Sequence, residues 1–470
     1  MLESMEQILA QISGWMWGPP LLVLLLGTHV FLTIRLRFIQ RYLPKAIRLS
    51  FSRSAEGEGD VSHFSALTVA LAATIGTGNI VGVATAVSLG GPGAVLWMWL
   101  TGVFGIATKY AEAVLSVKYR VVNERGQMAG GPMYVITRGL KMPWLGFLFA
   151  LFTAIAAFGI GNMVQANAVT SLIKETLEQQ LGASEATVSA SPWIAGAIMS
   201  LLTAMVLLGG IKSIGNTCTK LVPFMAVFYI LGCLVLLAIH ADTLPETVAL
   251  IIKSAFTGQA ATGGFVGAGV MAAMRYGAAR GLFSNESGLG SAPIVAAAAQ
   301  TRNPVRQALV SATGTFWDTV VICLLTGLVV VNSGKWMMAH DAGKLTHMAF
   351  QDLGWIGPSI LTIGLLTFVF STILGWSYYG EKAVEYLLGV RAVVPYRILW
   401  VIAVMVGSVV ELNMVWNFAD IANALMALPN LFALLLLSGV VIKETRQYLW
   451  EEHLDEDMAS PSGENSSSRM

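Results

Sequence analysis

The stretch from Leu71 to Ala84 combines an apolar setting with residues that weaken a helix. It lies in a segment apolar enough to cross a membrane, and its middle reads Thr-Ile-Gly-Thr-Gly-Asn. A break there would expose backbone NH and C=O groups at membrane depth, where protein, water or a ligand must satisfy them. The freed NH groups suit a carboxylate, and the freed carbonyls suit a cation. A Gly-rich face for helix packing is the alternative interpretation.

The composition indicates a polytopic membrane protein. The 470 residues are 55% hydrophobic and 12% charged, with a net charge of +1, whereas soluble domains are about 25% charged. This balance argues against nucleic-acid binding, because no basic run with interleaved aromatics is present. Cys218, Cys233 and Cys323 are widely spaced in or beside apolar runs, as packing cysteines are. No catalytic set of Ser, His and Asp stands out, so we do not expect an enzyme.

Apolar runs long enough to cross a membrane divide the chain into eleven predicted spans. They lie at about 14–34, 64–89, 94–117, 144–172, 192–211, 219–240, 255–282, 305–332, 355–379, 394–412 and 415–442.

The distribution of basic residues predicts the orientation of these spans. With the N terminus outside, most lysines and arginines fall on the cytoplasmic side, including Arg275 and Arg280 at the cytoplasmic end of the seventh span. Lys109 lies within a span, and the basic residues left outside are Lys174, Lys253, Lys335 and Lys344. We therefore predict an outside N terminus, a cytoplasmic C terminus and a disordered tail.

The seventh predicted span resembles the second in being interrupted. The segment Thr262–Gly269 reads Thr-Gly-Gly-Phe-Val-Gly-Ala-Gly and predicts a second break. The two breaks are five spans apart, so two groups of five spans would carry them at equivalent places in opposite orientation. Paired Gly-interrupted segments of this kind point to a midplane site in a secondary transporter with inverted repeats.

Four motifs then carry a resemblance to a known family. They are Gly-Thr-Gly-Asn at 76–79, Ala-Thr-Lys-Tyr-Ala-Glu-Ala-Val at 107–114, Gly-Gly-Pro-Met-Tyr at 130–134 and Gly-Leu-Phe-Ser-Asn-Glu-Ser-Gly-Leu-Gly-Ser-Ala-Pro at 281–293. Over nearly its whole length the chain resembles the bacterial and archaeal alanine or glycine:cation symporters. Gly76 to Asn79 is also similar to the Gly-Leu-Gly-Asn of the wider leucine-transporter-like fold group, with Thr77 in place of Leu.

The resemblance implies an all-α membrane protein of about 11 transmembrane helices, with a 5+5 inverted repeat and one additional N-terminal helix. It divides the chain into an N-terminal helix and basic loop (1–63), a first repeat (64–254), a second repeat (255–442) and a cytoplasmic tail (443–470), in a bacterial cytoplasmic (inner) membrane. It implies sodium-coupled uptake of alanine or glycine, with sodium co-transported and no organic cofactor. The oligomeric state stays unknown.

The same resemblance suggests which residues bind sodium and substrate. Sodium would take carbonyl oxygens of Ala72 and Ile75 and the hydroxyls of Ser371 and Thr372, although such hydroxyls can also bond their own helix. The substrate carboxylate would meet the NH groups of Thr77 and Gly78, with Gly76 permitting the turn. Thr74 and Asn79 would form a second cation site or contact the substrate.

Other polar and aromatic residues are candidates for the substrate pocket. Asn162 and Gln165 share a helix face and either meet the substrate or join helices. Phe158, Phe265 and Trp376 are candidate walls and gates that would restrict the cavity to alanine-sized side chains.

Ionisable residues inside the spans leave further alternatives open. Lys109 and Glu112 lie three apart on one helix, and we predict a structural ion pair between them. Asp318 is either a proton site or a packing carboxylate. Proton-coupled transport through Asp318 or Glu112 is therefore an alternative function, and a substrate-sensing or channel-like protein is a further one.

Overall fold

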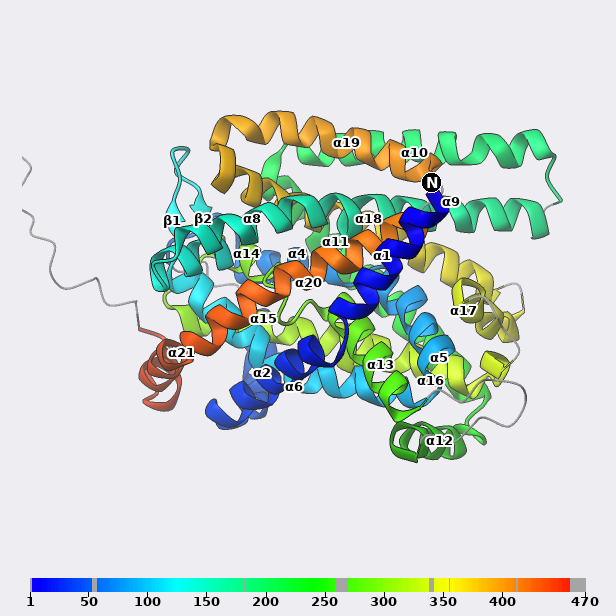
Figure 1. Ribbon diagram of the computed structural model, residues 1–470, viewed down its shortest axis with the longest axis horizontal. Coiled ribbons are helices and arrows are strands. Elements are labelled where there is room, and N and C mark those ends of the chain that lie inside the picture. Colours follow the sequence, from blue (N-terminus) through cyan, green and yellow to red (C-terminus); the bar gives the residue numbers. More distant parts are fainter. Residues whose placement is uncertain are drawn as a thin grey trace, which may run out of the picture.

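The computed structural model is almost wholly helical, as predicted (Figure 1). It describes residues 2–52, 57–180, 182–257, 269–337, 342–354, 356–410 and 413–456. Within these ranges the strands are β1 (Val121–Val122) and β2 (Met128–Ala129), which pair antiparallel as a small hairpin.

Helices of the first part of the chain are connected by short turns and π-helical segments. They are α1 (Leu2–Met16), α2 (Pro19–Arg35), α3 (Leu43–Ser50), α4 (His63–Thr74), α5 (Val83–Gly90), α6 (Gly93–Lys118), α7 (Pro132–Tyr134), α8 (Pro143–Phe158), α9 (Val164–Glu175), α10 (Glu185–Leu207), α11 (Gly210–Ile239) and α12 (Leu244–Thr257).

The helices from residue 270 onward include α18, which has 33 residues. They are α13 (Val270–Asn285), α14 (Pro293–Ala296), α15 (Pro304–Thr315), α16 (Leu324–Asn332), α17 (Ala342–Phe350), α18 (Ile356–Leu388), α19 (Val393–Val409), α20 (Asn413–Leu436) and α21 (Ser438–Thr445). A π-helical segment, Phe316–Cys323, makes α15 and α16 one continuous rod.

By length and composition, seven of the described helices can cross a membrane, and two bent pairs bring the number to nine. The predicted spans at 94–117 and 255–282 are not among them. The first is α6, whose apolar character is lowered by Lys109 and Glu112. The second includes residues 258–268, which lie outside the described part of the chain, and the 16-residue α13 forms most of its described part.

The first predicted break is present between α4 and α5. These helices are bent by 52° relative to each other. Ile75 ends α4 in an extended conformation (φ −76°, ψ 96°), and a π-helical turn over Gly78–Gly82 leads into α5. Every residue from Leu71 to Ile80 is buried, so protein covers the irregular backbone.

A second break lies at residues 286–292, in the motif that carried the family resemblance. α13 ends there with Glu286 in the left-handed region (φ 58°), and Gly288 and Gly290 have φ of 100° and 83°. All residues from Gly281 to Ala299 are buried. The break that we predicted at Thr262–Gly269 falls almost entirely on residues 258–268, outside the described part of the chain. Gly269 is the N-cap of α13.

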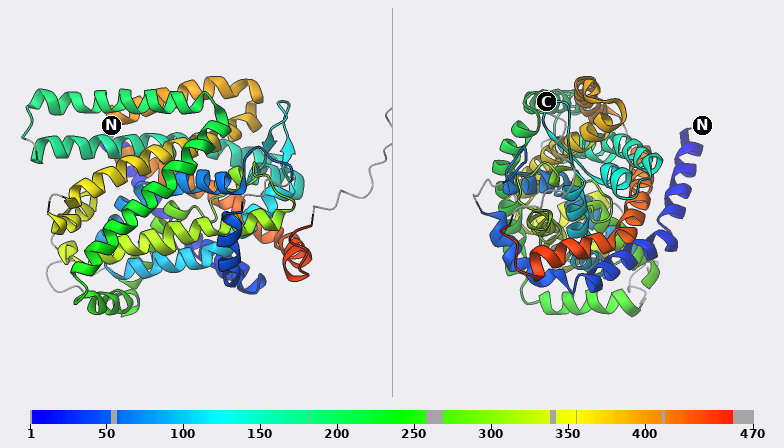
Figure 2. Two further views of the ribbon diagram at one scale, coloured as in Figure 1. Left: turned by 180° about the vertical axis from the view of Figure 1, so that it is seen from behind. Right: turned by 90° about the vertical axis from the view of Figure 1, so that its left-hand side faces the viewer.

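The connections gather at two opposite ends of the molecule. The β1–β2 hairpin and α21 lie at one end, and α12 and α17 lie at the other (Figure 1). The view from behind keeps this separation (Figure 2). Arg275 and Arg280, which we predicted at the cytoplasmic end of the seventh span, lie inside α13. There Arg275 donates to the Gly14 carbonyl and Arg280 pairs with Asp420 of α20.

Candidate functional site

The first break takes backbone carbonyls of α4 out of the hydrogen bonding of a regular helix. The NH of Gly76 bonds to the side-chain Oδ1 of Asn79 (2.8 Å) and not to the carbonyl of Ala72. The NH of Asn79 bonds to the carbonyl of Gly76 (3.2 Å) and not to that of Ile75. Since a helical NH bonds the carbonyl four residues earlier, the carbonyls of Ala72 and Ile75 are left without their helical partners.

Two hydroxyls of α18 face these carbonyls. Ser371 Oγ lies 3.4 Å from the oxygen of Ala72, and Thr372 Oγ1 lies 3.3 Å from the oxygen of Ile75. Both hydroxyls also donate to the carbonyl of Phe368, at 2.8 Å and 2.9 Å. The structure therefore brings together all four residues predicted for the sodium site, and the predicted bonding to their own helix occurs as well.

The carbonyl of Phe368 completes a set of five buried oxygen atoms, and we did not predict it. The signal was available, because a Ser or Thr in a helix often bonds the carbonyl three or four residues earlier. Carbonyl and hydroxyl oxygens are the ligands that hard cations prefer. Thr74 is not part of this set, since its hydroxyl bonds to the carbonyl of Leu71 (3.3 Å).

The NH of Thr77 points at the amide of Gln165. The Oε1 of Gln165 accepts this hydrogen bond at 3.3 Å, while its Nε2 donates to the carbonyl of Ile160 (2.9 Å). The hydroxyl of Thr77 is buried and has no hydrogen-bonding partner among the described residues. An amide oxygen thus lies where we predicted the substrate carboxylate, beside an unused hydroxyl.

Asn79 connects the first break to Asp318. Its Nδ2 donates to Asp318 Oδ1 (2.7 Å), and the same carboxylate accepts from Ser284 Oγ (3.1 Å and 2.9 Å) and Thr319 Oγ1 (2.6 Å). Ser284 is the next-to-last residue of α13, directly before the second break. The sequence showed Asn79 and Asp318 as separate candidates; their contact and the role of Ser284 come from the fold.

At the second break, a carboxylate of the protein accepts hydrogen bonds from the freed NH groups. Glu112 Oε1 accepts from the NH groups of Gly288 (2.9 Å) and Gly290 (3.1 Å) and from Asn430 Nδ2 (2.7 Å). Lys109 Nζ is buried and has no hydrogen-bonding partner among the described residues. The predicted ion pair is therefore wrong as a direct contact, because the freed NH groups compete for the same carboxylate.

Of the other residues predicted for the pocket, Gln165 contacts the first break, whereas Asn162 and Phe158 contact α19. Asn162 donates to the Trp400 carbonyl (2.9 Å), so of the predicted pair only Gln165 reaches the break. Phe158 packs against the rings of Tyr396 and Trp400 of α19, with centroids 5.4 Å apart in both cases. The described contacts of Phe158 thus lie in the scaffold, and Phe265 lies outside the described residues.

Trp376 of α18 lies against the π-helical turn after α8. A Cβ at Gly161 would be only 2.2 Å from the Trp376 Cβ, so only glycine fits there. The Trp376 ring also packs against the ring of Tyr379, with centroids 5.4 Å apart.

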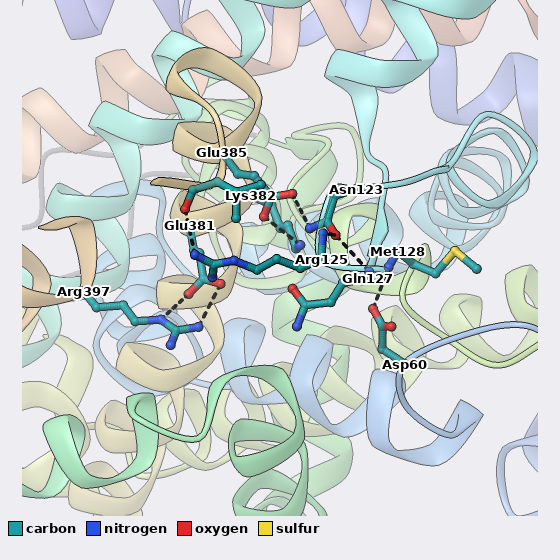
Figure 3. A network of polar contacts seen from close by, with 10 residues as sticks. Asp60, Asn123, Arg125, Gln127, Met128, Glu381, Lys382, Glu385 and Arg397 are labelled. Atoms are coloured by element: carbon teal, nitrogen blue, oxygen red, sulfur yellow. Dashed lines mark hydrogen bonds and ion pairs between the residues drawn. The ribbon is translucent and has the colours of Figure 1, made fainter. Parts of the chain in front are cut away.

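At the hairpin end, a polar network joins three parts of the chain (Figure 3). Asp60, just before α4, accepts from the NH of Met128 (2.9 Å), and Asn123 of the hairpin donates to Glu385 of α18 (2.8 Å). Glu385 also pairs with Lys382 (2.9 Å). Burial raises the pKa of Asp60 above its usual value, against the opposing effect of the Met128 hydrogen bond. The hairpin thus ties the segment before the first break to α18.

Comparisons with known proteins agree with this architecture. The family model described as the sodium:alanine symporter family matches residues 2–461. The sodium/alanine symporter AgcS of Methanococcus maripaludis is 51% identical over 448 residues, covering 93% of this chain and 96% of that protein. A Haemophilus influenzae protein described as an uncharacterized transporter is also 51% identical, over 97% of this chain and 99% of its own length.

A solved structure supports the fold. The chain superposes on MhsT in complex with L-phenylalanine with a TM-score of 0.59 and 14% identity, covering 84% of this chain and 95% of MhsT. At that identity the likeness concerns the fold, which is the transporter fold with broken helices that the resemblance implied. With the family model matching almost every residue, the chain belongs to the sodium:alanine symporter family.

Proposed function

We propose that this protein imports a small neutral amino acid, alanine or glycine, together with sodium by alternating access. The observation that carries the proposal is the meeting of two α18 hydroxyls with the two carbonyls that the first break frees. The name of the M. maripaludis relative supports sodium and alanine as the transported pair. An inner-membrane location with the N terminus outside and the C terminus inside belongs to the same proposal, as does the division into two five-helix repeats.

The spacing of the oxygens in this cluster suits a sodium ion. Na⁺ has nearly the radius of Ca²⁺, whose ligand distances are about 2.3–2.6 Å. Two ligands at right angles about 2.4 Å from an ion lie about 3.4 Å apart, and the hydroxyl–carbonyl pairs are 3.3 Å and 3.4 Å apart. Sodium would therefore bind among Ala72, Ile75, Phe368, Ser371 and Thr372 once the hydroxyl protons turn away.

The substrate carboxylate would bind at the NH groups of Thr77 and Gly78. The oxygen of Gln165 holds the Thr77 NH, and an incoming carboxylate would replace or join it. The buried Thr77 hydroxyl offers a further donor. A Cβ at Gly76 would lie 2.5 Å from Thr372 Oγ1, so the backbone that binds substrate is in direct contact with the sodium ligands. This contact gives each ligand a means to favour the binding of the other.

Asn79 is the candidate for a second cation site. Its side chain lies between the first break and the buried carboxylate of Asp318, with Ser284 and Thr319 bonded to the same oxygens. A carboxylate with hydroxyl and amide neighbours is a suitable environment for a second sodium ion.

The decisive experiment is uptake of radiolabelled alanine into proteoliposomes at constant pH. We expect accumulation with an inward sodium gradient and none when potassium replaces sodium. Thr372→Val removes one sodium ligand and keeps the shape of the side chain. With one oxygen ligand fewer, the apparent sodium affinity should fall about 10- to 100-fold, which corresponds to about 1.4–2.8 kcal/mol.

Thr367→Val is the matched control for this experiment. Thr367 lies on the same helix and its hydroxyl bonds only to carbonyls of α18, those of Ile363 and Gly364, among the described residues. Its replacement should leave sodium dependence unchanged. Uptake that follows a proton gradient and ignores sodium would overturn the function, whereas sodium-driven uptake unaffected by Thr372→Val would overturn only the site.

A further inference from the structure

A groove of about 700 Å³ is lined by residues of α11 and by Phe370 of α18. One end is polar and is lined by Ser213, Asn216, Thr217 and Lys220. The other end is aromatic and includes Phe224 of α11, which is 56% exposed, and Phe370 of α18. The groove therefore changes from hydrogen-bonding to apolar along its length.

The spacing of the lining residues places them on one stripe of α11. Ser213, Thr217, Lys220 and Phe224 follow each other at intervals of four, three and four residues, which is the repeat of a single helix face. The polar members come first in the chain, and the phenyl ring comes one turn after the lysine. A molecule bound along this stripe would meet the hydroxyls, the amide, the ammonium group and then the ring.

The length of α11 places the transition from polar to apolar lining at the edge of the bilayer. The segment from Leu221 to Ile239 contains no charged residue. It rises about 28 Å at about 1.5 Å per residue, close to the hydrocarbon thickness of about 30 Å. Lys220 therefore lies at the depth of the lipid phosphates, with Asn216 and Ser213 among the headgroups. Phe224 and Phe370 lie at the depth of the acyl chains.

The charge of the groove favours an anionic occupant. No acidic side chain is among the residues that line it. Lys220 is exposed and forms no ion pair within the described part of the chain. By the predicted orientation this end of α11 faces the cytoplasmic leaflet, where anionic lipids attract basic residues by about 1 kcal/mol each.

We propose that this groove is a binding site for one anionic phospholipid. The phosphate lies against Lys220 and accepts hydrogen bonds from Asn216, Thr217 and Ser213, while an acyl chain lies against Phe224 and Phe370. The proposal concerns lipid binding and does not depend on which ion or amino acid the protein transports.

Native mass spectrometry of the full-length protein with added lipids tests the site. Phosphatidylglycerol is the anionic probe, and phosphatidylcholine with the same acyl chains is the zwitterionic one. We expect one phosphatidylglycerol to be retained preferentially, and Lys220→Gln to weaken its binding about fivefold. Phe224→Ala should weaken the binding of both lipids, because it removes contact with the acyl chain.

Lys212→Gln is the control, since Lys212 is an exposed lysine of the same helix that does not line the groove. Retention that is unchanged in Lys220→Gln would overturn the proposal, as would an equal loss in both lysine variants, which indicates diffuse charge attraction. Lys220-dependent binding of inorganic phosphate as strong as that of the lipid would also overturn it, because it would show a site for soluble anions.

Discussion

Thr372 Oγ1 lies 3.3 Å from the carbonyl oxygen of Ile75, although the two residues are 297 positions apart. One belongs to an unbroken helix and the other to the point where a helix ends. The side-chain Oδ1 of Asn79 accepts from the NH of Gly76, and the NH of Asn79 donates to the carbonyl of Gly76. The carbonyl of Ile75 therefore has no helical partner and faces α18.

Thr77→Val should lower the affinity for alanine while leaving sodium binding intact. The buried Thr77 hydroxyl has no partner among the described residues, so its removal costs the empty protein little. A lost hydrogen bond to the substrate carboxylate corresponds to about 1.5–3 kcal/mol, or about 10- to 100-fold in affinity. Alanine titration of uptake at saturating sodium measures the effect. Thr77→Ser, which keeps the hydroxyl, should behave as the parent protein; equal losses in both variants would argue against a side-chain contact.

Gly76→Ala should abolish sodium-dependent uptake, with Gly82→Ala as its matched control. A Cβ at Gly76 would lie 2.5 Å from Thr372 Oγ1 and 3.3 Å from Gln165 Oε1, so both ligand sites must shift. At Gly82, in the next turn, the nearest atom to a new Cβ is the Thr77 carbonyl oxygen at 3.9 Å. We therefore expect near-normal uptake from Gly82→Ala in the same proteoliposome assay. Similar activity of the two variants would show that the close approach at Gly76 is not required.

Lys109→Met and Glu112→Gln should together destabilise the protein by less than the sum of their separate effects. Thermal or denaturant unfolding of the purified variants measures the free energies of unfolding. Both groups are buried and interact electrostatically, Lys109 also with Glu286 and Asp318, so each single variant disturbs the balance of buried charge and should destabilise the protein. The double variant removes both charges and keeps an oxygen to accept from Gly288 and Gly290. Its destabilisation should be smaller than the sum of the single effects by about 0.5–3 kcal/mol. Strict additivity would mean that Lys109 serves another group.

Asp60→Asn should remove a pH dependence from the stability of the protein. Burial raises the pKa of Asp60 in the folded state. Between the ordinary value of about 3.9 and the raised one, the folded protein holds a proton that the unfolded chain has released. Stability therefore falls as the pH rises through this window. Subtracting the melting temperature of Asp60→Asn from that of the parent protein, pH by pH, isolates the effect. A difference in melting temperature that grows as the pH rises would contradict the prediction.

The first break was predictable because its cause is local. Gly76, Gly78 and the capping side chain of Asn79 lie within four positions, and their propensities act in any context. The break predicted at 262–269 lies almost entirely outside the described residues, so it stays a prediction. At 286–292, by contrast, the backbone is held open by Glu112, whose contacts with Gly288 and Gly290 span 176 and 178 positions.

Contacts within the candidate site also depend on residues that are distant in the sequence. Ser371 and Thr372 were paired with Ala72 and Ile75 only through the family resemblance, since no property of α18 alone selects these hydroxyls. Phe158 was chosen for its size and position in the sequence. The direction in which its ring points depends on Tyr396 and Trp400 of a distant helix, and a single sequence does not supply that packing.

The hydrogen bonds of Ser371 and Thr372 also bear on the return of the unloaded carrier. Each hydroxyl has one proton, which can turn to the carbonyl of Phe368 (2.8 Å and 2.9 Å) or to that of Ala72 or Ile75 (3.4 Å and 3.3 Å). Part of the oxygen cluster therefore stays hydrogen-bonded when no ion is bound. The empty protein can then reorient at a smaller desolvation cost than a cluster of wholly unpaired carbonyls would impose. The hydroxyls would thus act as a reversible plug for the cation site, and the rate of recycling would depend on how readily they rotate.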